Sequence, residues 1–474
     1  MPIFYLTLAW LAVRAGLKLG RLGDFNYLAG GMLFFSIVSS LLALAQWLGL
    51  SGLGTYLADL PAGGRPFGNL SQPNNLAHVC FIGLAAAAWF FERGMIGRLA
   101  AAVLIVVIGF GLVASGSRVA WLQIIGAVLF LVAMQKRLDS KKLLNFMLMA
   151  LLLCVLLRLA FPVLAKLVLL WDPRSLAEQA DPGLRVEMWQ MAWHSLTLQP
   201  WLGFGWMQIN SAQQLVAHQF PNHHEHFEHS HNLVLDLFLW NGAVIGLIAC
   251  GLLCSWLIGR LRSINHREGL VSAAMLIGML AHAMVEYPLD YAYLLLPLGM
   301  LMGVMEAQHV PSAPLEKPGR DWATIALMAA CLLFFLKLST EYLSAEIRMR
   351  DTRLESFGIG PTPPQPGLDG YVLLDHLDHY MDFIGTPATQ GMKPEALEAM
   401  QAIARRFGYA PVLMRYALAL GLNGKSKEAI DTLELLCHMH APQRCREAAD
   451  GWSGARLRWP FLPAWHPTSA DSRR

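Results

Sequence analysis

The sequence predicts an all-α, polytopic membrane protein. Of its 474 residues, 55% are hydrophobic and only 15% are charged, and the mean hydropathy is +0.43. Such a chain is too apolar for an ordinary soluble protein. A helix needs about 20 apolar residues to cross the roughly 30 Å hydrocarbon core of a bilayer, and runs of that length recur here. The net charge of +3 is too small to indicate nucleic acid binding.

Apolar runs predict about ten membrane spans. They cover residues 2–19, 25–50, 74–92, 99–115, 119–135, 143–170, 231–259, 270–286, 289–307 and 322–339. When the spans are threaded alternately, the short loops rich in Lys and Arg all fall on one side, which marks that side as cytoplasmic. The long loop 171–230 and the region from about residue 340 are then expected on the opposite face. Met1 also falls there without a signal-peptide pattern, so we expect one or more further spans to precede it. The alternative is a first helix whose N-terminus lies outside and whose orientation depends on Arg14, Lys18 and Arg21 alone.

A histidine-rich tract precedes the run that begins at residue 231. Its members lie within nine positions and are His223, His224, His226, His229 and His231. The tract could bind a metal, because imidazole is a common ligand, or it could be an ordinary polar loop. It could instead supply a group for proton transfer or for holding an anionic leaving group. His231 is the favoured candidate, because entry into a helix would fix its direction.

Two arginines are expected at the non-cytoplasmic membrane face. Arg118 lies in SGSRVAW between two apolar runs, where a charge is costly unless it is paired, lines a wet cavity or reaches the surface. Arg185 begins a segment whose Met188 and Met191 have the spacing of an amphipathic surface helix. Arg185 either anchors that helix at the interface or, together with Arg118, would suit a diphosphate, because guanidiniums pair with phosphate oxygens bidentately.

Two polar turns complete the expected outer face. The segment 65–79 (RPFGNLSQPNNLAHV) is rich in amides such as Asn69 and Gln72, which either cap a helix or bind hydroxyl groups. The segment 282–303 carries Glu286 and several tyrosines between two spans. Interfacial tyrosines are common, whereas carboxylates at so tight a turn suggest a function.

The C-terminal region differs in composition from the apolar part. A proline-rich stretch at residues 361–367 is followed by sequence with ordinary charge content. The small and large apolar residues of a paired-helix repeat are Ala417, Leu420, Ala429, Leu433 and Leu436, with Gly424 in the turn. We therefore predict a membrane domain over residues 1–340 and a small, tetratricopeptide-like helical domain over 341–474. Cys437 and Cys445 would either form a disulfide in an oxidising compartment or remain free.

Five motifs in the chain carry a family resemblance. They are GNLSQPNNLA, SGSR, the R-x-x-M-W segment followed by PWLGFGWMQ, HSHN-x9-G ending at Gly242, and VEYPLDYAYLLLPLG. Together they resemble the bacterial membrane O-linked oligosaccharyltransferases, the protein-glycosylating branch of the O-antigen ligase superfamily. The resemblance covers about residues 60–310. HSHN-x9-G is shared with O-antigen ligases and polymerases, whereas the first and last motifs favour the protein-glycosylating branch.

This resemblance implies a GT-C-like enzyme of the bacterial inner membrane that needs no metal or other cofactor. It would transfer a glycan, with inversion, from undecaprenyl diphosphate to a Ser or Thr hydroxyl of an exported, pilin-like protein on the periplasmic face. By analogy, His231 would act as a base or bind the diphosphate, Arg118 and Arg185 would stabilise the leaving group, and Gln72 and Tyr291 would position acceptor or sugar. Three further positioning candidates are Asn69, Asn232 and Glu286.

Other functions remain open from the sequence. An O-antigen ligase or polymerase would use the same chemistry with a different acceptor. A transporter would be expected to show internal repeats and ionisable residues within its spans, and only Arg158 and Lys166 stand out. A zinc sensor would need further ligands at regular spacing, and only Glu225 and Glu228 lie close to the histidines.

Overall fold

The computed structural model describes residues 2–50, 57–60, 64–70, 72–169, 184–222, 224–309, 322–356 and 370–467. Within these ranges the chain is helical and contains no strand, so the predicted all-α class is confirmed. Residues 171–183, His223 and the proline-rich stretch 361–367 lie outside the described residues.

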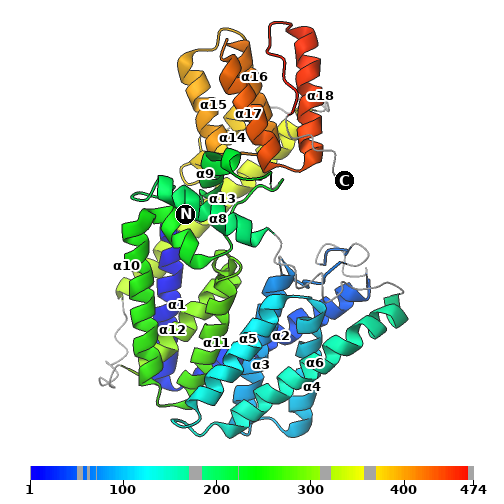
Figure 1. Ribbon diagram of the computed structural model, residues 1–474. Coiled ribbons are helices and arrows are strands. Elements are labelled where there is room, and N and C mark those ends of the chain that lie inside the picture. The colour runs from blue at the N-terminus through cyan, green and yellow to red at the C-terminus, as the bar shows by residue number, and fades with distance from the viewer. Residues whose placement is uncertain are drawn as a thin grey trace.

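Each of the ten predicted apolar runs falls on a helix (Figure 1). The helices are α1 (Pro2–Leu22), α2 (Phe25–Trp47), α3 (Pro73–Glu92), α4 (Arg98–Ala114), α5 (Arg118–Met134), α6 (Lys141–Leu169), α10 (Leu233–Ser263), α11 (Arg267–Ala283), α12 (Ala292–Ala307) and α13 (Trp322–Ser356). Among the described residues, α2, α3, α6, α10 and α13 are long and apolar enough to cross a membrane by length and composition. The fold is that of a polytopic membrane protein, and the number of spans stays a prediction.

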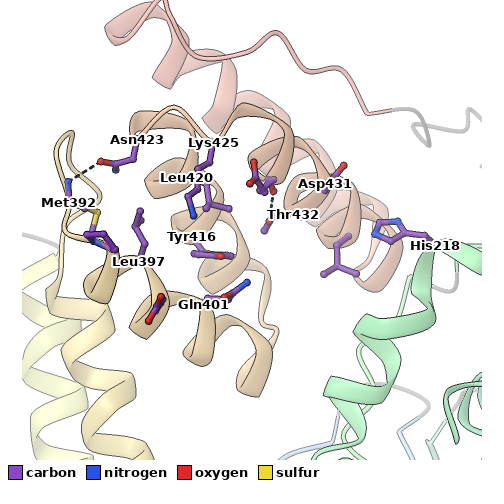
Figure 2. Close-up of a pocket in the computed structure, with 14 residues that line it drawn as sticks. His218, Met392, Leu397, Gln401, Tyr416, Leu420, Asn423, Lys425, Asp431 and Thr432 are labelled. Atoms are coloured by element: carbon purple, nitrogen blue, oxygen red, sulfur yellow. Dashed lines mark hydrogen bonds between the residues drawn. The ribbon is translucent and has the colours of Figure 1, made fainter. Parts of the chain in front are cut away.

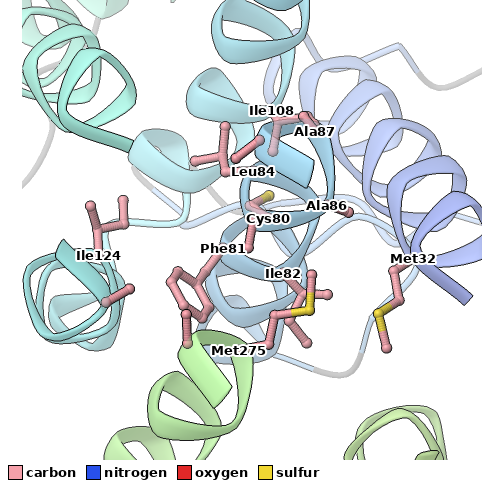
Figure 3. Close-up of a cluster of buried hydrophobic side chains, with 14 of the residues drawn as sticks. Met32, Cys80, Phe81, Ile82, Leu84, Ala86, Ala87, Ile108, Ile124 and Met275 are labelled. Atoms are coloured by element: carbon pink, nitrogen blue, oxygen red, sulfur yellow. The ribbon is translucent and has the colours of Figure 1, made fainter. Parts of the chain in front are cut away.

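Helix α3 is at the centre of the apolar helices. The structure buries 83% of its most hydrophobic window, against only 11% for α10. Figure 3 shows Phe81 of α3 among side chains from neighbouring helices, including Ile124 of α5 and Met275 of α11. A run of small residues, Gly83 and the alanines at 85–88, lets these neighbours approach closely. The apolar side chains that α10 leaves exposed suit contact with lipid.

Helices α1 and α12 pack through glycines spaced four residues apart. Gly16 and Gly20 of α1 lie against the backbone of α12, and Gly299 and Gly303 of α12 lie against α1. A Cβ atom at Gly16 would lie 2.0 Å from the carbonyl oxygen of Met300. Small residues at this spacing allow backbones to approach closely and are a common way to join membrane helices.

The C-terminal helices form a separate bundle at one end of the molecule (Figure 1). They are α14 (Asp375–Gly385), α15 (Pro394–Phe407), α16 (Ala410–Leu422), α17 (Ser426–Met439) and α18 (Pro442–Arg458). The repeat-like apolar residues on α16 and α17 are all buried, as their spacing predicts. Gly424 has φ +79° in the turn between these two helices. Cys437 and Cys445 form a disulfide that joins α17 to α18, which decides the alternative that the sequence left open.

Helix α13 continues beyond the predicted span end at residue 339 and reaches this bundle. Its buried Glu341 accepts hydrogen bonds from the backbone N–H groups of Leu373 (2.8 Å) and Leu374 (3.0 Å). Arg348, two turns further along, forms an ion pair with Asp378 of α14. The helix is therefore a continuous connection between the apolar helices and the bundle.

Candidate active site

The site lies at the ends of α3, α5, α10 and α11 that face the C-terminal bundle. Between them and the bundle are α8 (Arg185–Leu198) and α9 (Ile209–Val216), as Figure 1 shows. The short helix η2 (Ala217–Gln219) directly follows α9. The segment of α8 is helical as predicted, and its Met188 and Met191 are buried in a cluster with side chains of α9 and α10. Its position along a membrane surface stays a prediction. Arg185 is the first residue of α8, so the packing of the helix positions its side chain.

Glu286, in the turn after α11, connects three segments that are distant in sequence. Its side chain is only 4% exposed. One carboxylate oxygen, Oε2, lies 2.9 Å from Nδ1 of His231. The other, Oε1, accepts a hydrogen bond of 2.7 Å from Nδ2 of Asn74 and forms an ion pair with Arg185. The structure therefore brings together His231, Arg185 and Glu286, three of the residues predicted from the sequence.

Asn74 extends this network to the start of α5. Its Oδ1 accepts hydrogen bonds from Oγ of Ser117 (2.8 Å) and Nη2 of Arg65 (3.1 Å). Nε of Arg65 also donates to the carbonyl of Ser115 at 2.6 Å. Arg118 directly follows Ser117 as the first residue of α5, so the SGSR turn is joined to the site through Ser117.

The HSHN motif determines how His231 enters the site. His231 has φ +53°, a left-handed conformation that is uncommon for residues other than glycine. Asn232 follows as the N-cap of α10, and its Oδ1 accepts the N–H groups of Val234 (3.0 Å) and Leu235 (3.1 Å). Nδ2 of Asn232 also donates to the carbonyl of Met284 at 3.2 Å. Asn232 therefore holds His231 in place from the helix end.

The glycine of HSHN-x9-G is a kink in α10. Gly242 has φ +78°, and a Cβ atom there would lie 2.1 Å from the carbonyl oxygen of Trp201. The PWLGFGW loop packs against α10 at this kink. The backbone N–H of Phe204 donates to the carbonyl of Leu239, and the N–H of Ala243 donates to the carbonyl of Pro200, both at 2.6 Å. The motif glycine is thus required where the loop after α8 meets α10.

The other predicted site residues lie around this network. Tyr291 stacks between two tyrosines, with ring centroids 6.1 Å from Tyr287 and 5.4 Å from Tyr293. Gln72 precedes α3, two positions before Asn74, and its buried Nε2 has no hydrogen-bond partner in the described part of the chain. Asn69 is exposed in the preceding turn. The structure gives none of these three a direct contact with Glu286 or His231.

A second pair of titratable groups was not assigned from the sequence. Nε2 of His229 lies 3.2 Å from Oδ2 of Asp290, and the His229 ring stacks on Tyr287 with centroids 4.1 Å apart. Burial, with the nearby His231, lowers the pKa of His229 to about 4. Burial, with Asp236, raises the pKa of Asp290 to about 7. His229 lies two positions before His231, and Asp290 lies directly before Tyr291. Including the titratable neighbours of the predicted site residues would therefore have found this pair.

The electrostatics favour an ionised Glu286. Burial by itself raises the pKa of this carboxyl, but the hydrogen bond and charge of His231, with the charge of Arg185, outweigh burial and lower its pKa below the usual value. A carboxylate can only accept hydrogen bonds, so Nδ1 of His231 carries the proton. In the neutral form of the ring, Nε2 then has a lone pair that can take a proton from a hydroxyl group.

Replacing Asp290 with asparagine is expected to raise the melting temperature, more at pH 8 than at pH 5. A carboxyl whose folded pKa is raised destabilises the folded state as pH rises from the unfolded value near 4 towards 7, and asparagine removes that charge. Thermal unfolding of the purified protein at both pH values measures the difference. Asp450→Asn, an exposed carboxylate on α18, is the control. An equal rise in melting temperature at both pH values would contradict the raised pKa of Asp290.

The histidines of the tract contact two different parts of the molecule. His229 and His231 face the site, whereas His226 contacts the C-terminal bundle through the carbonyl of Phe407, 3.0 Å from its Nε2. In the described ranges, which exclude His223, no group of three or more His, Cys, Asp or Glu residues is arranged to hold a metal ion.

Comparison with known proteins gives related matches over most of the chain. Residues 100–250 match the family described as O-antigen ligase, and residues 270–453 match the family described as virulence factor membrane-bound polymerase, C-terminal. A general O-oligosaccharyltransferase of Acinetobacter baylyi is 28% identical over 64% of this chain and 55% of its own length. A ComP-specific O-oligosaccharyltransferase of the same organism is 30% identical over 53% of this chain and 45% of its own length.

The chain thus spans about half the length of the curated relatives that it matches. The O-antigen ligase match includes Arg118, Arg185 and His231, and the second match includes Glu286 and the C-terminal bundle. The network around Glu286 therefore combines residues from both matched regions. The chain is therefore similar to the O-antigen ligase family over residues 100–250, and the two relatives that it matches are named as bacterial O-oligosaccharyltransferases.

Proposed function

We propose that the protein transfers a glycan from undecaprenyl diphosphate to a Ser or Thr hydroxyl of an exported, pilin-like protein, with inversion and without a metal. The observation that carries the proposal is the buried Glu286 carboxylate, which contacts both His231 and Arg185. An oriented imidazole beside a guanidinium supplies the two functions that the reaction needs, a base and a partner for an anionic leaving group.

In the proposed reaction, Nε2 of His231 removes the proton from the acceptor hydroxyl. The oxygen attacks the anomeric carbon of the glycan from the side opposite the diphosphate, and the bond from that carbon to the phosphate oxygen breaks. Glu286 stabilises the imidazolium that forms, as a carboxylate does for other catalytic histidines. Arg185 and Arg118 stabilise the charge that develops on the released diphosphate, a role for which guanidinium suits phosphate well.

The orientation of the site is part of the proposal. The disulfide between Cys437 and Cys445 supports a periplasmic position for the C-terminal bundle, since disulfides persist in oxidising compartments. The site lies at the end of the apolar helices that faces this bundle. We therefore infer an inner-membrane protein whose site opens to the periplasm, where a lipid-linked donor and an exported acceptor would meet.

The second candidate function is that of an O-antigen ligase, with the lipid A core as acceptor. The family match over residues 100–250 favours it. The two relatives named as O-oligosaccharyltransferases favour a protein acceptor instead. Both functions use the same donor and the same proposed chemistry.

The two functions are separated by supplying the full chain, in a bacterial host, with an undecaprenyl diphosphate-linked glycan and either a pilin-type acceptor or a lipid A core acceptor. Glycan on the pilin, lost in His231→Ala, is the expected result. Glycan on lipopolysaccharide alone would assign the ligase function, and the absence of both products would refute the proposal.

In isolated membranes, addition of a chelator is expected to leave the rate of glycan transfer unchanged.

A further inference from the structure

The C-terminal bundle is joined to the segment that leads into His231. Nδ2 of Asn210, on α9, donates to the carbonyls of Arg405 (3.0 Å) and Arg406 (3.1 Å). Nε2 of Gln214 donates to the carbonyl of Ala404 at 3.0 Å. These carbonyls belong to the last turn of α15, where a helix has no backbone partners of its own. The contact is therefore built from side chains that satisfy a helix end.

A groove of 620 Å³ runs along the bundle beside this contact. Figure 2 shows its lining side chains on α15, α16 and α17, with His218 of η2 at one end. Asn423 fixes the other end, because it accepts the N–H of Met392 (2.9 Å) and donates to the carbonyl of Thr389 (2.8 Å). The volume is within the range of pockets that hold a ligand.

The groove combines an apolar floor with an acidic rim. Its floor includes Leu397 and Leu420, and the ring of Tyr416 lies beside them (Figure 2). Three exposed carboxylates and one exposed amine also line it, from Glu398, Glu428, Asp431 and Lys425. In the part of the chain that the structure describes, none of these carboxylates forms an ion pair. The lining therefore carries an excess of two negative charges.

We propose that this groove binds a segment of the acceptor polypeptide that carries Lys or Arg next to apolar side chains. The inference rests on the proposed function and adds the place and the chemistry of acceptor recognition. The apolar floor would hold the apolar side chains of the segment, and the carboxylates would pair with its cationic groups. His218 lines the groove thirteen positions before His231, so a bound segment lies against the same part of the chain that carries the proposed base.

The charge of the groove also excludes the donor. A lipid diphosphate and the anionic lipid headgroups of a bacterial membrane would both be repelled by three unpaired carboxylates. Of the two guanidiniums predicted for the diphosphate, Arg185 pairs with Glu286, and Arg118 follows Ser117, which donates to Asn74 of the same network. Donor and acceptor thus have separate surfaces of opposite charge.

The test measures binding without any glycan donor. The full chain in detergent is titrated against a short fluorescent peptide that contains Ser, Lys and apolar residues, and against the same peptide with Glu in place of Lys. We expect only the Lys peptide to bind, and added salt to weaken it. In the double variant Glu428→Lys with Asp431→Lys, its affinity is expected to fall by at least about tenfold. Asp450→Lys on α18, outside the groove, is the matched control and should bind as the unmodified protein does.

Three results would overturn the inference: equal binding of both peptides, unchanged affinity in the double variant, or an equal loss in Asp450→Lys. Circular dichroism of each variant shows whether it is folded. His231→Ala is expected to bind the Lys peptide normally. If the peptide binds but no glycan is transferred, the proposed function fails and the groove stands. If glycan is transferred with no change in the KM for the acceptor protein in the double variant, the groove fails and the proposed function stands.

Discussion

Replacement of His231 by alanine is expected to reduce the rate of glycan transfer by about 10²- to 10⁴-fold, the range that a positioned general base contributes. The physical reason is the orientation of the ring. Glu286 accepts a hydrogen bond from Nδ1 of His231 (2.9 Å), and the rings of His231 and Tyr287 pack edge to face with centroids 5.0 Å apart. Single-turnover transfer to an acceptor protein in membranes measures the effect.

Glu286→Gln separates orientation from charge at the same position. Glutamine retains the shape of the side chain but offers no charge to the imidazolium or to Arg185, so we expect kcat to fall while the KM for the acceptor changes little.

His194→Ala is the matched control for His231→Ala, because the His194 imidazole contacts Gln219 and Phe220 and not the Glu286 network. Full activity in His231→Ala at normal expression would remove His231 from the reaction. A loss in His194→Ala of the same size would show that the assay reports folding alone.

Gly242→Val is expected to have the second large effect, on both stability and transfer. With φ +78° and ψ 175°, Gly242 lies in a backbone region essentially restricted to glycine, where another residue costs about 1–3 kcal/mol. In addition, the new Cβ would lie 2.1 Å from the carbonyl oxygen of Trp201, so the backbone of the PWLGFGW loop would have to move. Because that loop follows α8, its displacement would also move Arg185. Thermal unfolding and the transfer assay should both show the loss.

The control for this prediction is on the same helix. Gly251 lies in α10, nine positions after Gly242, and a Cβ atom there would meet nothing within 4 Å. Gly251→Ala is therefore expected to be neutral or slightly stabilising, by roughly 0.5–1 kcal/mol. If Gly242→Val unfolded at the same temperature as the unmodified protein, the kink would not be needed for packing of the loop against α10.

Hydrophobic length and periodicity were enough to predict the helices. Every predicted apolar run is a helix, because a segment that must satisfy its backbone hydrogen bonds in an apolar setting has few alternatives. The amphipathic spacing of Met188 and Met191 and the repeat spacing of Leu433 and Leu436 also correspond to buried side chains. These features depend on local sequence, which a single chain displays directly.

The connections within the site depend on contacts between residues far apart in the chain, which a single sequence does not reveal. Asn74 and Glu286 are separated by 212 positions, and only the packing of α3 against α11 brings them together. Arg65 and Ser117 lie in segments that the sequence analysis singled out, but nothing in those segments indicated that both side chains donate to Asn74. Arg185 was expected to be available for a diphosphate, and the structure pairs it with Glu286. Donor binding would then require that pair to open or to accept the phosphate alongside it.

The side-chain contacts between α9 and the end of α15 have a consequence for protein engineering. The C-terminal helices do not meet the rest of the chain through a simple linker alone, since residues 209–228 supply Asn210, Gln214 and His226 as their docking partners. A chimera that exchanged only the C-terminal helices with those of a relative would leave these three side chains facing a foreign helix end. The transferable module is therefore discontinuous, and exchanging residues 209–228 together with the helices would preserve the joint.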